Sequence, residues 1–541
     1  MNKQLIIRSA VKTFVFISAS LVMLGCNSGS SDSDTPVVET PPSYPDFAYV
    51  RHLGDSATAA DQSASGHGFS TPIPTLNENE LDKHLAGDAH FETSFTTAPN
   101  DEHPELDGLG PVFNNQDCNS CHQRDGRSST LVVPNGEERI LLGAEAGIFL
   151  RMSLDDGTCS NPSIDNNYCK NVGVPDFGTQ LFHRGVLKAR DDWQSAPFIG
   201  QANVFLSYEY QDIEYSDGHI VRLKKPLFDI EMAYDVSPEN IANSAIMQSN
   251  VRYSPRNGMP IFGLGLLELI PEEDILALAD EEDSNNDGIS GRANWVFDPV
   301  KDKNGDALPV SLGRFGWKAS TPSVRVQSLG ALRGDMGITN PLFPQESIAN
   351  TAMHDSYLAR TNFVDTGADN AGEPEASQIF SDEVVFYAET LAVPSRRDVE
   401  AETVLNGAKL FEQVNCTGCH HPGFVTLSEN AVIGGLAAPE ALQGQKIYPF
   451  TDMLLHDLGE GLADNRRDFM ATGNEWKTRP LWGIGLTKTV NPAAGFLHDG
   501  RADTIEEAIL WHGGEAEQSK TDFMALTQPD RDSLIAFVMS L

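Results

Sequence analysis

Four of the seven cysteines occur in two copies of one short pattern. The copies are Cys118-Asn-Ser-Cys121-His122 and Cys416-Thr-Gly-Cys419-His420. A C-x-x-C-H pattern is the attachment signature of c-type haem, in which two thiols bond to the porphyrin and the adjacent His coordinates the iron. A zinc half-site or a redox dithiol needs only C-x-x-C, and neither explains a His that follows in both copies. We therefore expect two covalently bound haem c groups, with His122 and His420 as iron ligands.

Two further cysteines enclose a short polar loop. Cys159 and Cys169 flank residues 160–168. In an oxidising compartment this pair predicts a structural disulfide, which would stabilise the fold by about 2–3 kcal/mol. A redox-active thiol pair is the alternative, but the pair does not have C-x-x-C spacing.

The N-terminus has the pattern of an export signal. Basic residues precede the apolar run 14–24, which is too short to span a bilayer. The string Val22-Met-Leu-Gly-Cys26 resembles the cleavage box of bacterial lipoproteins, in which the Cys is lipidated; an ordinary secretory signal with an incidental Cys is the alternative. We expect a signal peptide over residues 1–25, followed by a lipidated N-terminus and flexible linker over 26–55. Asn27 is not the Asp that retains lipoproteins at the inner membrane, which favours a periplasmic protein anchored to the outer membrane.

The composition is that of a globular and strongly acidic protein. The 541 residues are 40% apolar and carry a net charge of −39. Phosphate backbones would repel such a chain, so we do not expect it to bind nucleic acid. We expect contact with a membrane only through the lipid anchor.

Local patterns predict helices beside the second signature and strands between the two signatures. Segment 407–411 precedes Cys416 on an expected helix, and apolar residues at 534, 537, 538 and 541 form the stripe of a C-terminal helix. Near-alternating β-branched and aromatic residues at 204–210 and 220–223 predict a β-insertion. We expect a mainly α fold with two cytochrome c-like haem domains. The first covers 56–395 and is elaborated with the β-containing insertion, and the second covers 396–541.

Several longer strings resemble one bacterial family. They are Leu109–Asn114 before the first signature, Arg314–Ala319, Tyr448–Asp457, Glu475–Gly485 and Phe496–Ala516. Over roughly residues 85–541 the chain resembles the di-haem oxidoreductases often labelled thiol oxidoreductases. That family is related to the di-haem cytochrome c peroxidases and to the di-haem enzyme that matures methylamine dehydrogenase. The resemblance implies one peroxide-reactive haem and one electron-transfer haem.

The same resemblance implies a second ligand for the haem of the second signature. In the peroxidase relatives, a Met fourteen residues after the His of His-Asp-Gly-Arg ligates the electron-transfer haem. Fourteen residues after His498 this chain has His512, and replacing Met by His should lower the potential of that haem. As alternatives, His512 caps its helix, and Met453 or Met470 is the ligand.

The resemblance also implies catalytic residues in the first domain. The relatives carry a Trp between the haems, and a Gln and an acid on the distal face of the peroxidatic haem. Trp317, Gln327 and Asp335 match these positions, although Asp335 is two residues closer to the Trp than the relatives' Glu. The acid would relay a proton between the peroxide oxygens, and the amide would orient the peroxide. The alternative is a core Trp and a Gln on a helix surface.

An acidic loop and three other polar residues are further candidates. Asp283, Asn285 and Asp287 match oxygen positions of a calcium loop, but Asn294 replaces the usual bidentate Glu, so a plain acidic turn is the alternative. Arg501 suits a haem propionate. Either His183 or His219 could cap the first haem, and the sequence does not choose between them.

These features together predict a di-haem oxidoreductase. Electrons from a small redox protein, a cytochrome or a cupredoxin, would enter at the second haem and pass to the first, where hydrogen peroxide would be reduced. One alternative is a non-catalytic electron-transfer cytochrome, and another is an oxidase of a partner protein.

Overall fold

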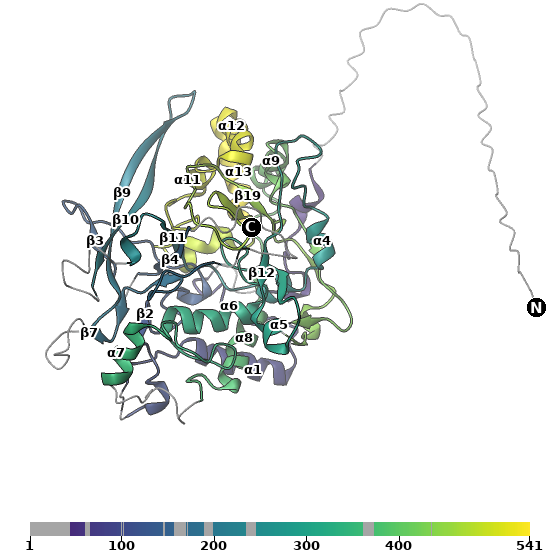
Figure 1. The fold of residues 1–541 in the computed structure, drawn as a ribbon. Coiled ribbons are helices and arrows are strands. Elements are labelled where there is room, and N and C mark those ends of the chain that lie inside the picture. The colour runs from purple at the N-terminus through teal and green to yellow at the C-terminus, as the bar shows by residue number, and fades with distance from the viewer. Residues whose placement is uncertain are drawn as a thin grey trace, which may run out of the picture. The chain divides into compact units, whose positions relative to one another are not determined.

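The computed structural model describes residues 44–59, 65–98, 100, 102–143, 146–155, 169, 171–188, 198–233, 245–360, 373–433 and 435–541. The predicted signal peptide, Cys26 and Cys159 lie outside the described residues. Residues Tyr44–Leu541 form one compact unit, drawn as a coloured ribbon in Figure 1. Within the described residues, no helix is long and apolar enough to cross a bilayer.

The helices are short, and they lie in several separate parts of the chain. They are α1 (Glu78–Phe91), α3 (Leu264–Glu268), α4 (Glu272–Leu276), α5 (Pro299–Asn304), α6 (Val324–Ala331), α7 (Ala352–Arg360), α8 (Gln378–Thr390), α9 (Glu402–Gln413), α10 (Thr487–Val490), α11 (Ile505–Leu510), α12 (Glu517–Ala525) and α13 (Gln528–Ser540).

The predicted helix pair beside the second signature is present. Helix α9 precedes Cys416 and packs against the C-terminal helix α13. The Thr527 side chain caps α13 by accepting a hydrogen bond from the Asp530 N–H. The helices approach closely at Gly407, where a Cβ atom would lie 1.9 Å from the carbonyl oxygen of Ser533. Phe411 and Phe537 then pack ring to ring in the core, 5.2 Å apart.

A second helix pair repeats this arrangement beside the first signature. Helix α1 packs against α8, and a Cβ atom at Gly87 would lie 2.2 Å from the carbonyl oxygen of Glu383. In both pairs a Phe four residues after the glycine reaches the His of the signature. The Phe91–His122 and Phe411–His420 ring pairs share one geometry, with centroids 6.2 Å apart and planes inclined at 51°.

The expectation of a mainly α fold with two cytochrome c-like domains is wrong. Helices make up 31% of the structure and strands 20%, and the strands form many small sheets. The chain has 46 Gly and 31 Pro, which interrupt regular elements, so short strand pairs satisfy backbone groups between the helices. The predicted domain boundary near residue 395 stays a prediction.

Most strands have only two or three residues. The shorter ones are β1 (Thr58–Ala59), β2 (Val112–Phe113), β3 (Ile140–Leu141), β5 (Gln180–Leu181), β6 (Arg184–Gly185), β7 (Leu187–Lys188), β8 (Phe198–Ile199), β12 (Trp295–Phe297), β13 (Val310–Leu312), β14 (Val393–Pro394), β15 (Phe424–Val425), β16 (Val432–Ile433), β17 (Leu436–Ala437), β18 (Lys446–Ile447), β19 (Leu455–Asp457) and β20 (Glu475–Lys477). The longer ones are β4 (Ile148–Leu154), β9 (Ala202–Glu214), β10 (Ile220–Met232) and β11 (Val251–Asn257).

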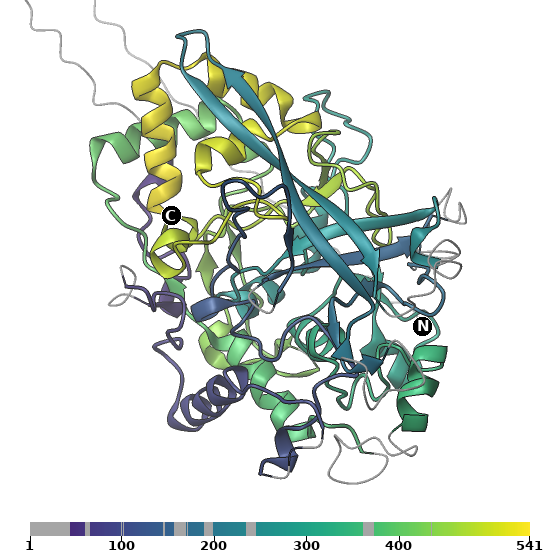
Figure 2. The same cartoon turned by 90° about the vertical axis from the view of Figure 1, so that its left-hand side faces the viewer.

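The predicted β-insertion is a long antiparallel hairpin of β9 and β10, in register from Ala202↔Met232 to Glu214↔Ile220. In Figure 2 it is a twisted ribbon that runs toward the yellow C-terminal helices. The hairpin is tied to that C-terminal region by three polar contacts: Tyr215–Glu506 at 2.9 Å, Asp217–Arg531 at 2.6 Å and Lys224–Asp503 at 2.7 Å.

Candidate functional site

The second signature opens onto a large cavity with mainly apolar walls. Cys416, Cys419, His420 and His512 all line it, and it is partly open to solvent. Its apolar wall includes Phe411, Leu458, Leu462, Leu481, Phe496, Ile505, Ile509, Phe523, Leu534 and Val538. An apolar cavity between two imidazoles fits a haem.

The tautomers of the two histidines are set by backbone carbonyls. Nδ1 of His420 lies 3.0 Å from the carbonyl oxygen of Phe450, and Nδ1 of His512 lies 2.8 Å from that of Ala508. A carbonyl oxygen can only accept, so each Nδ1 carries the hydrogen and each Nε2 keeps its lone pair. Burial lowers the pKa of both rings, that of His420 to about 4. Both are therefore neutral and ready to ligate iron.

Helix α11 places His512. The Thr504 side chain caps α11 by accepting a hydrogen bond from the Glu507 N–H, and the helix ends immediately before Trp511. The competing candidates Met453 and Met470 are buried elsewhere, and neither is among the described residues that line the cavity.

Two arginines that line the cavity, the buried Arg127 and the half-buried Arg479, have no anionic partner among the described residues. The guanidinium carbons of Arg127 and Arg479 lie 5.4 and 5.2 Å from the Trp317 ring centroid, and neither forms an ion pair with a described residue. Burial lowers the pKa of Arg127 to about 10, and burial together with Arg127 lowers that of Arg479 to about 9. Because like charges are costly to bury together, this pair fits the two carboxylates of a haem.

Arg501, the sequence candidate for a propionate, has other partners. Its guanidinium donates to both carboxylate oxygens of Asp499, from Nε to Oδ1 at 3.0 Å and from Nη2 to Oδ2 at 2.7 Å, and to the carbonyl of Gly461. It also stacks over the Trp511 ring at 4.6 Å. Its charge is thus balanced within the protein.

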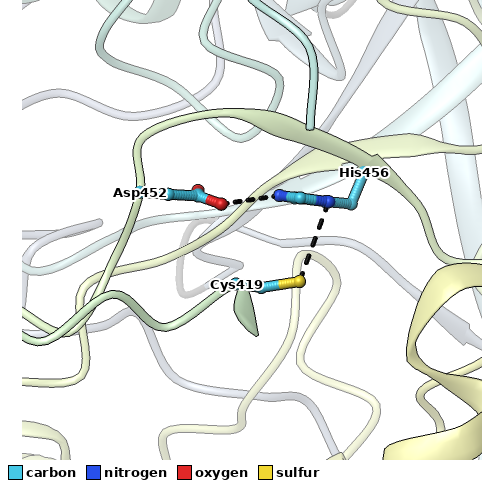
Figure 3. A group of neighbouring side chains, drawn as sticks. All are labelled: Cys419, Asp452 and His456. Atoms are coloured by element: carbon cyan, nitrogen blue, oxygen red, sulfur yellow. Dashed lines mark hydrogen bonds and ion pairs between the residues drawn. The ribbon is translucent and has the colours of Figure 1, made fainter. Parts of the chain in front are cut away.

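A buried histidine, His456, lies beside the second signature. His456 contacts Asp452 and Glu515, each at 2.7 Å, and its Nδ1 lies 3.7 Å from the Cys419 sulfur; Figure 3 shows the Asp452 and Cys419 contacts. Burial alone would lower the pKa of His456, but the hydrogen bonds to these carboxylates and to Cys419 raise it well above its ordinary value. The ring is therefore a cation held against the thiol that would carry the porphyrin. Cys419, Asp452 and His456 could also be grouped as metal ligands, but Cys419 belongs to the haem signature.

Trp317 belongs to a short aromatic row in the same cavity. Its ring meets His498 edge to face at 6.4 Å, and His498 stacks on Trp476 at 3.8 Å. Nε1 of Trp317 donates to the carbonyl of Asn257. The next residue, Gly258, packs so closely on Cys121 that a Cβ would lie 2.3 Å from the Cys121 carbonyl oxygen. Trp317 thus connects the neighbourhood of the first signature with the cavity of the second.

The first signature repeats the histidine arrangement of the second. Nδ1 of His122 lies 2.6 Å from the carbonyl oxygen of Met259, which leaves its Nε2 free for iron. The Asn115 amide donates to the Cys121 sulfur at 3.1 Å. None of the four signature cysteines forms a disulfide. Burial raises the pKa of Cys121 and Cys416 to about 12, so neither signature behaves as an activated redox dithiol.

Asp335 lies at the first signature. It stands in a π-helical turn, Leu332–Met336, that continues α6; such turns are frequent at functional sites. Burial raises the pKa of Asp335, while Arg151, Gln180 and His122 act in the opposite direction. The Gln180 amide donates to Oδ1 of Asp335 at 2.7 Å. A carboxyl with a raised pKa suits proton transfer.

Gln327 has a different position from Asp335. Its side-chain oxygen accepts a hydrogen bond from the Thr321 hydroxyl at 2.8 Å, in the loop that follows Trp317. The contacts of the two residues are therefore separate, and the amide next to Asp335 belongs to Gln180.

Unpartnered polar atoms gather near Asp335. Among the described residues, Nδ2 of Asn114, Oδ1 of Asn115, Oε1 of Gln180 and Nε2 of His183 are buried without a hydrogen-bond partner. The His183 N–H bonds to Asn114, and the N–H groups of Asn114 and Asn115 bond to the Asp335 carbonyl. Buried polar groups are normally satisfied, so this cluster fits a bound group and its ligand.

The structure separates the two histidines that the sequence left as equal candidates for the first haem. His183 lies in the polar cluster, and burial lowers its pKa to about 4. His219 stands at the exposed tip of the β9–β10 hairpin, 3.9 Å from Glu506.

The remaining sequence candidates are the residues of the expected calcium loop and Cys169. Asp283, Asn285 and Asp287 lie in one exposed loop, where their side chains accept hydrogen bonds from N–H groups of the same loop. Cys169 is disulfide-bonded, while its predicted partner Cys159 lies outside the described residues.

Comparison with known proteins identifies the family of this chain. A family model described as "Di-haem oxidoreductase, putative peroxidase" matches residues 47–541. No curated protein and no solved structure matches the chain significantly.

Proposed function

Because this chain belongs to the di-haem oxidoreductase family, we propose that it is a c-type di-haem enzyme that reduces hydrogen peroxide with electrons from a small redox protein. The observation that carries the proposal is the difference between the two sites. His420 shares its cavity with a second neutral imidazole, His512, whereas His122 has the half-buried acid Asp335 as a neighbour. Two imidazoles suit electron transfer, and an acid beside one imidazole suits peroxide chemistry.

The residues that would hold the cofactors follow from the contacts. Cys118 and Cys121 would carry the first haem, and Cys416 and Cys419 the second. Nε2 of His122, His420 and His512 would ligate iron. Arg127 and Arg479 would pair with propionates in the larger cavity, in place of Arg501.

When bound, the haems supply electron storage and the reduction of the peroxide bond. The chain supplies the proton handling. Asp335 would take a proton from the peroxide oxygen nearer the iron and return it to the leaving oxygen. Gln180 holds the Asp335 carboxyl in place by donating to its Oδ1. Trp317 lies between the two neighbourhoods and would provide the route for the electron.

One observation favours a second candidate function. His183 is half-buried and neutral, and its buried Nε2 has no partner among the described residues. If that nitrogen ligated the first iron, both sites would be six-coordinate and the protein would be a non-catalytic electron-transfer cytochrome. An oxidase of a partner protein, like the proposed peroxidase, would need one coordination position of the first iron to stay open.

One spectroscopic experiment distinguishes these candidates. Purified holoprotein is examined by EPR in the fully oxidised and half-reduced states, alongside the His183→Ala variant. The proposed enzyme should give one low-spin signal and one five-coordinate high-spin signal in at least one state. Two low-spin signals, one of which is lost in His183→Ala, would establish the electron-transfer cytochrome instead.

We further propose that the protein is exported and anchored by lipid at Cys26, since its haem attachment would take place outside the cytoplasm. Labelling cells with a radioactive fatty acid and comparing the wild type with Cys26→Ser tests the anchor.

Calcium at Asp283, Asn285 and Asp287 also stays a proposal, and calcium titration followed by intrinsic fluorescence tests it.

A further inference from the structure

An exposed apolar patch begins five residues after His420. It consists of Val425, Leu427 and Val432, whose exposed fractions are 52%, 40% and 59%. Single exposed apolar side chains are ordinary, but a group of them marks an interaction site. These three lie on or beside the short strands β15 and β16.

Acidic residues of α4 border this patch. Glu272, Glu273 and Asp274 are exposed; α4 is labelled in Figure 1. Leu427 and Val432 line one surface hollow together with Glu272 and Glu273. Val425 lines a neighbouring hollow with Asp274, and Lys446 is the cation in that hollow.

The patch is also close to the second haem signature. His421, the residue after the proposed ligand His420, lines the same hollow as Val425 and Asp274. Five residues of chain join His420 to Val425, so their Cα atoms are at most about 18 Å apart. A redox partner seated on the patch would therefore come close to the proposed electron-transfer haem.

We propose that this patch is the docking surface for the electron donor, a small basic redox protein with an apolar cofactor edge. The proposal rests on the proposed function and adds the place where electrons enter. The apolar side chains would exclude water around the two cofactor edges. The acidic residues of α4, on a chain of net charge −39, would attract and orient the basic partner.

The test compares two triple charge reversals that change the net charge equally. One is Glu272→Lys, Glu273→Lys and Asp274→Lys beside the patch. The control is Glu209→Lys, Asp212→Lys and Glu214→Lys on the exposed part of β9. Stopped-flow absorbance follows reduction of the oxidised holoprotein by reduced, basic mono-haem cytochrome c at several ionic strengths.

The patch reversal should lower the second-order rate constant about tenfold or more at low salt and flatten its salt dependence. The control should change it less than about twofold. A third variant, Leu427→Ser with Val432→Ser, should slow reduction even at high salt, where charge attraction is screened. An equal loss in both reversals, or no loss in either, would overturn the proposal.

Because the triple substitution could unfold α4, cross-linking of the unaltered holoprotein tests the docking surface a second way. A zero-length carbodiimide links carboxylates to the lysines of bound cytochrome c, and mass spectrometry should locate the links at Glu272, Glu273 or Asp274. Links at β9 and β10, or links through the patch to a second copy of this chain, would overturn it. Dithionite reduces the haems without docking. If the holoprotein reduced by dithionite failed to reduce hydrogen peroxide, the proposed function itself would be refuted.

Discussion

His420 and His512 line one cavity, and each ring has its Nδ1 against a backbone carbonyl oxygen. These carbonyls fix the tautomers in which both Nε2 atoms can ligate. The resemblance to the peroxidase relatives pointed to His512 from the sequence, and the hydrogen bond to Ala508 leaves its Nε2 available to ligate.

The first prediction concerns His512. In His512→Ala, the second haem should lose its low-spin EPR signal and become high-spin, because the variant removes the neutral imidazole that shares the cavity with His420. Met453→Leu, which alters a residue outside the cavity lining, is the control and should keep the wild-type spectrum. A low-spin signal that survived His512→Ala unchanged would show that another group ligates the iron.

The second prediction concerns Asp335. Asp335→Asn should lower peroxide turnover by about 100-fold or more, since general acid–base groups contribute on that scale. Haem content and the low-spin signal should stay unchanged. Asp229→Asn, on the exposed side of β10, controls for loss of a surface charge. Full turnover in Asp335→Asn would remove the proton role from this residue.

The third prediction tests the two repeated helix contacts. Gly87→Ala and Gly407→Ala would each push a Cβ to within 2.2 and 1.9 Å of a carbonyl oxygen. Each should destabilise the protein by about 1–3 kcal/mol in urea unfolding, because the paired helices must move apart. Gly330→Ala in α6 is the matched control, since its Cβ would only touch Phe343 at 3.8 Å. Equal stability of all three variants would contradict the proposed close contacts.

The fourth prediction is a pH dependence of stability. Burial alone would raise the pKa of Asp468, but Arg466 and Arg256 lower it to about 2. The carboxyl has an ordinary value near 3.8 when unfolded. Its contribution of about 2–3 kcal/mol is therefore present above that value and lost as pH falls toward 2. Melting temperatures measured across this acid range should show the loss.

The variant Asp468→Asn should remove this part of the acid dependence and, at neutral pH, cost about 3 kcal/mol by leaving the buried Arg466 without its anion. Asp212→Asn, whose ion pair with Arg222 is exposed, should leave the melting curves nearly unchanged. An acid dependence that Asp468→Asn does not alter would assign the effect to other carboxylates.

Local sequence patterns predicted the parts of the molecule that are themselves local. The signatures, the helices α9 and α13 and the β9–β10 hairpin each have a pattern within a few residues. The ion pair between Arg501 and Asp499 is also local, because the two residues are two positions apart. The sequence analysis nevertheless assigned Arg501 to a propionate.

Contacts between distant segments could not be predicted in this way. Arg127 and Arg479 meet at Trp317 only after the two halves of the chain fold together. Gln180 lies in a two-residue strand, which is too short to show a periodic pattern. No pattern in the sequence therefore indicates its contact with Asp335. The same shortness of most strands explains why the chain was taken as mainly α.

The contacts at the tip of the β9–β10 hairpin have a consequence for how the chain can be divided. Tyr215, Asp217 and Lys224 belong to the sequence before residue 395, and their partners Glu506, Arg531 and Asp503 come after it. A fragment that starts at residue 396 would leave Arg531 buried without its carboxylate. We therefore expect the two halves to denature in a single transition and to require co-expression if the chain is cut.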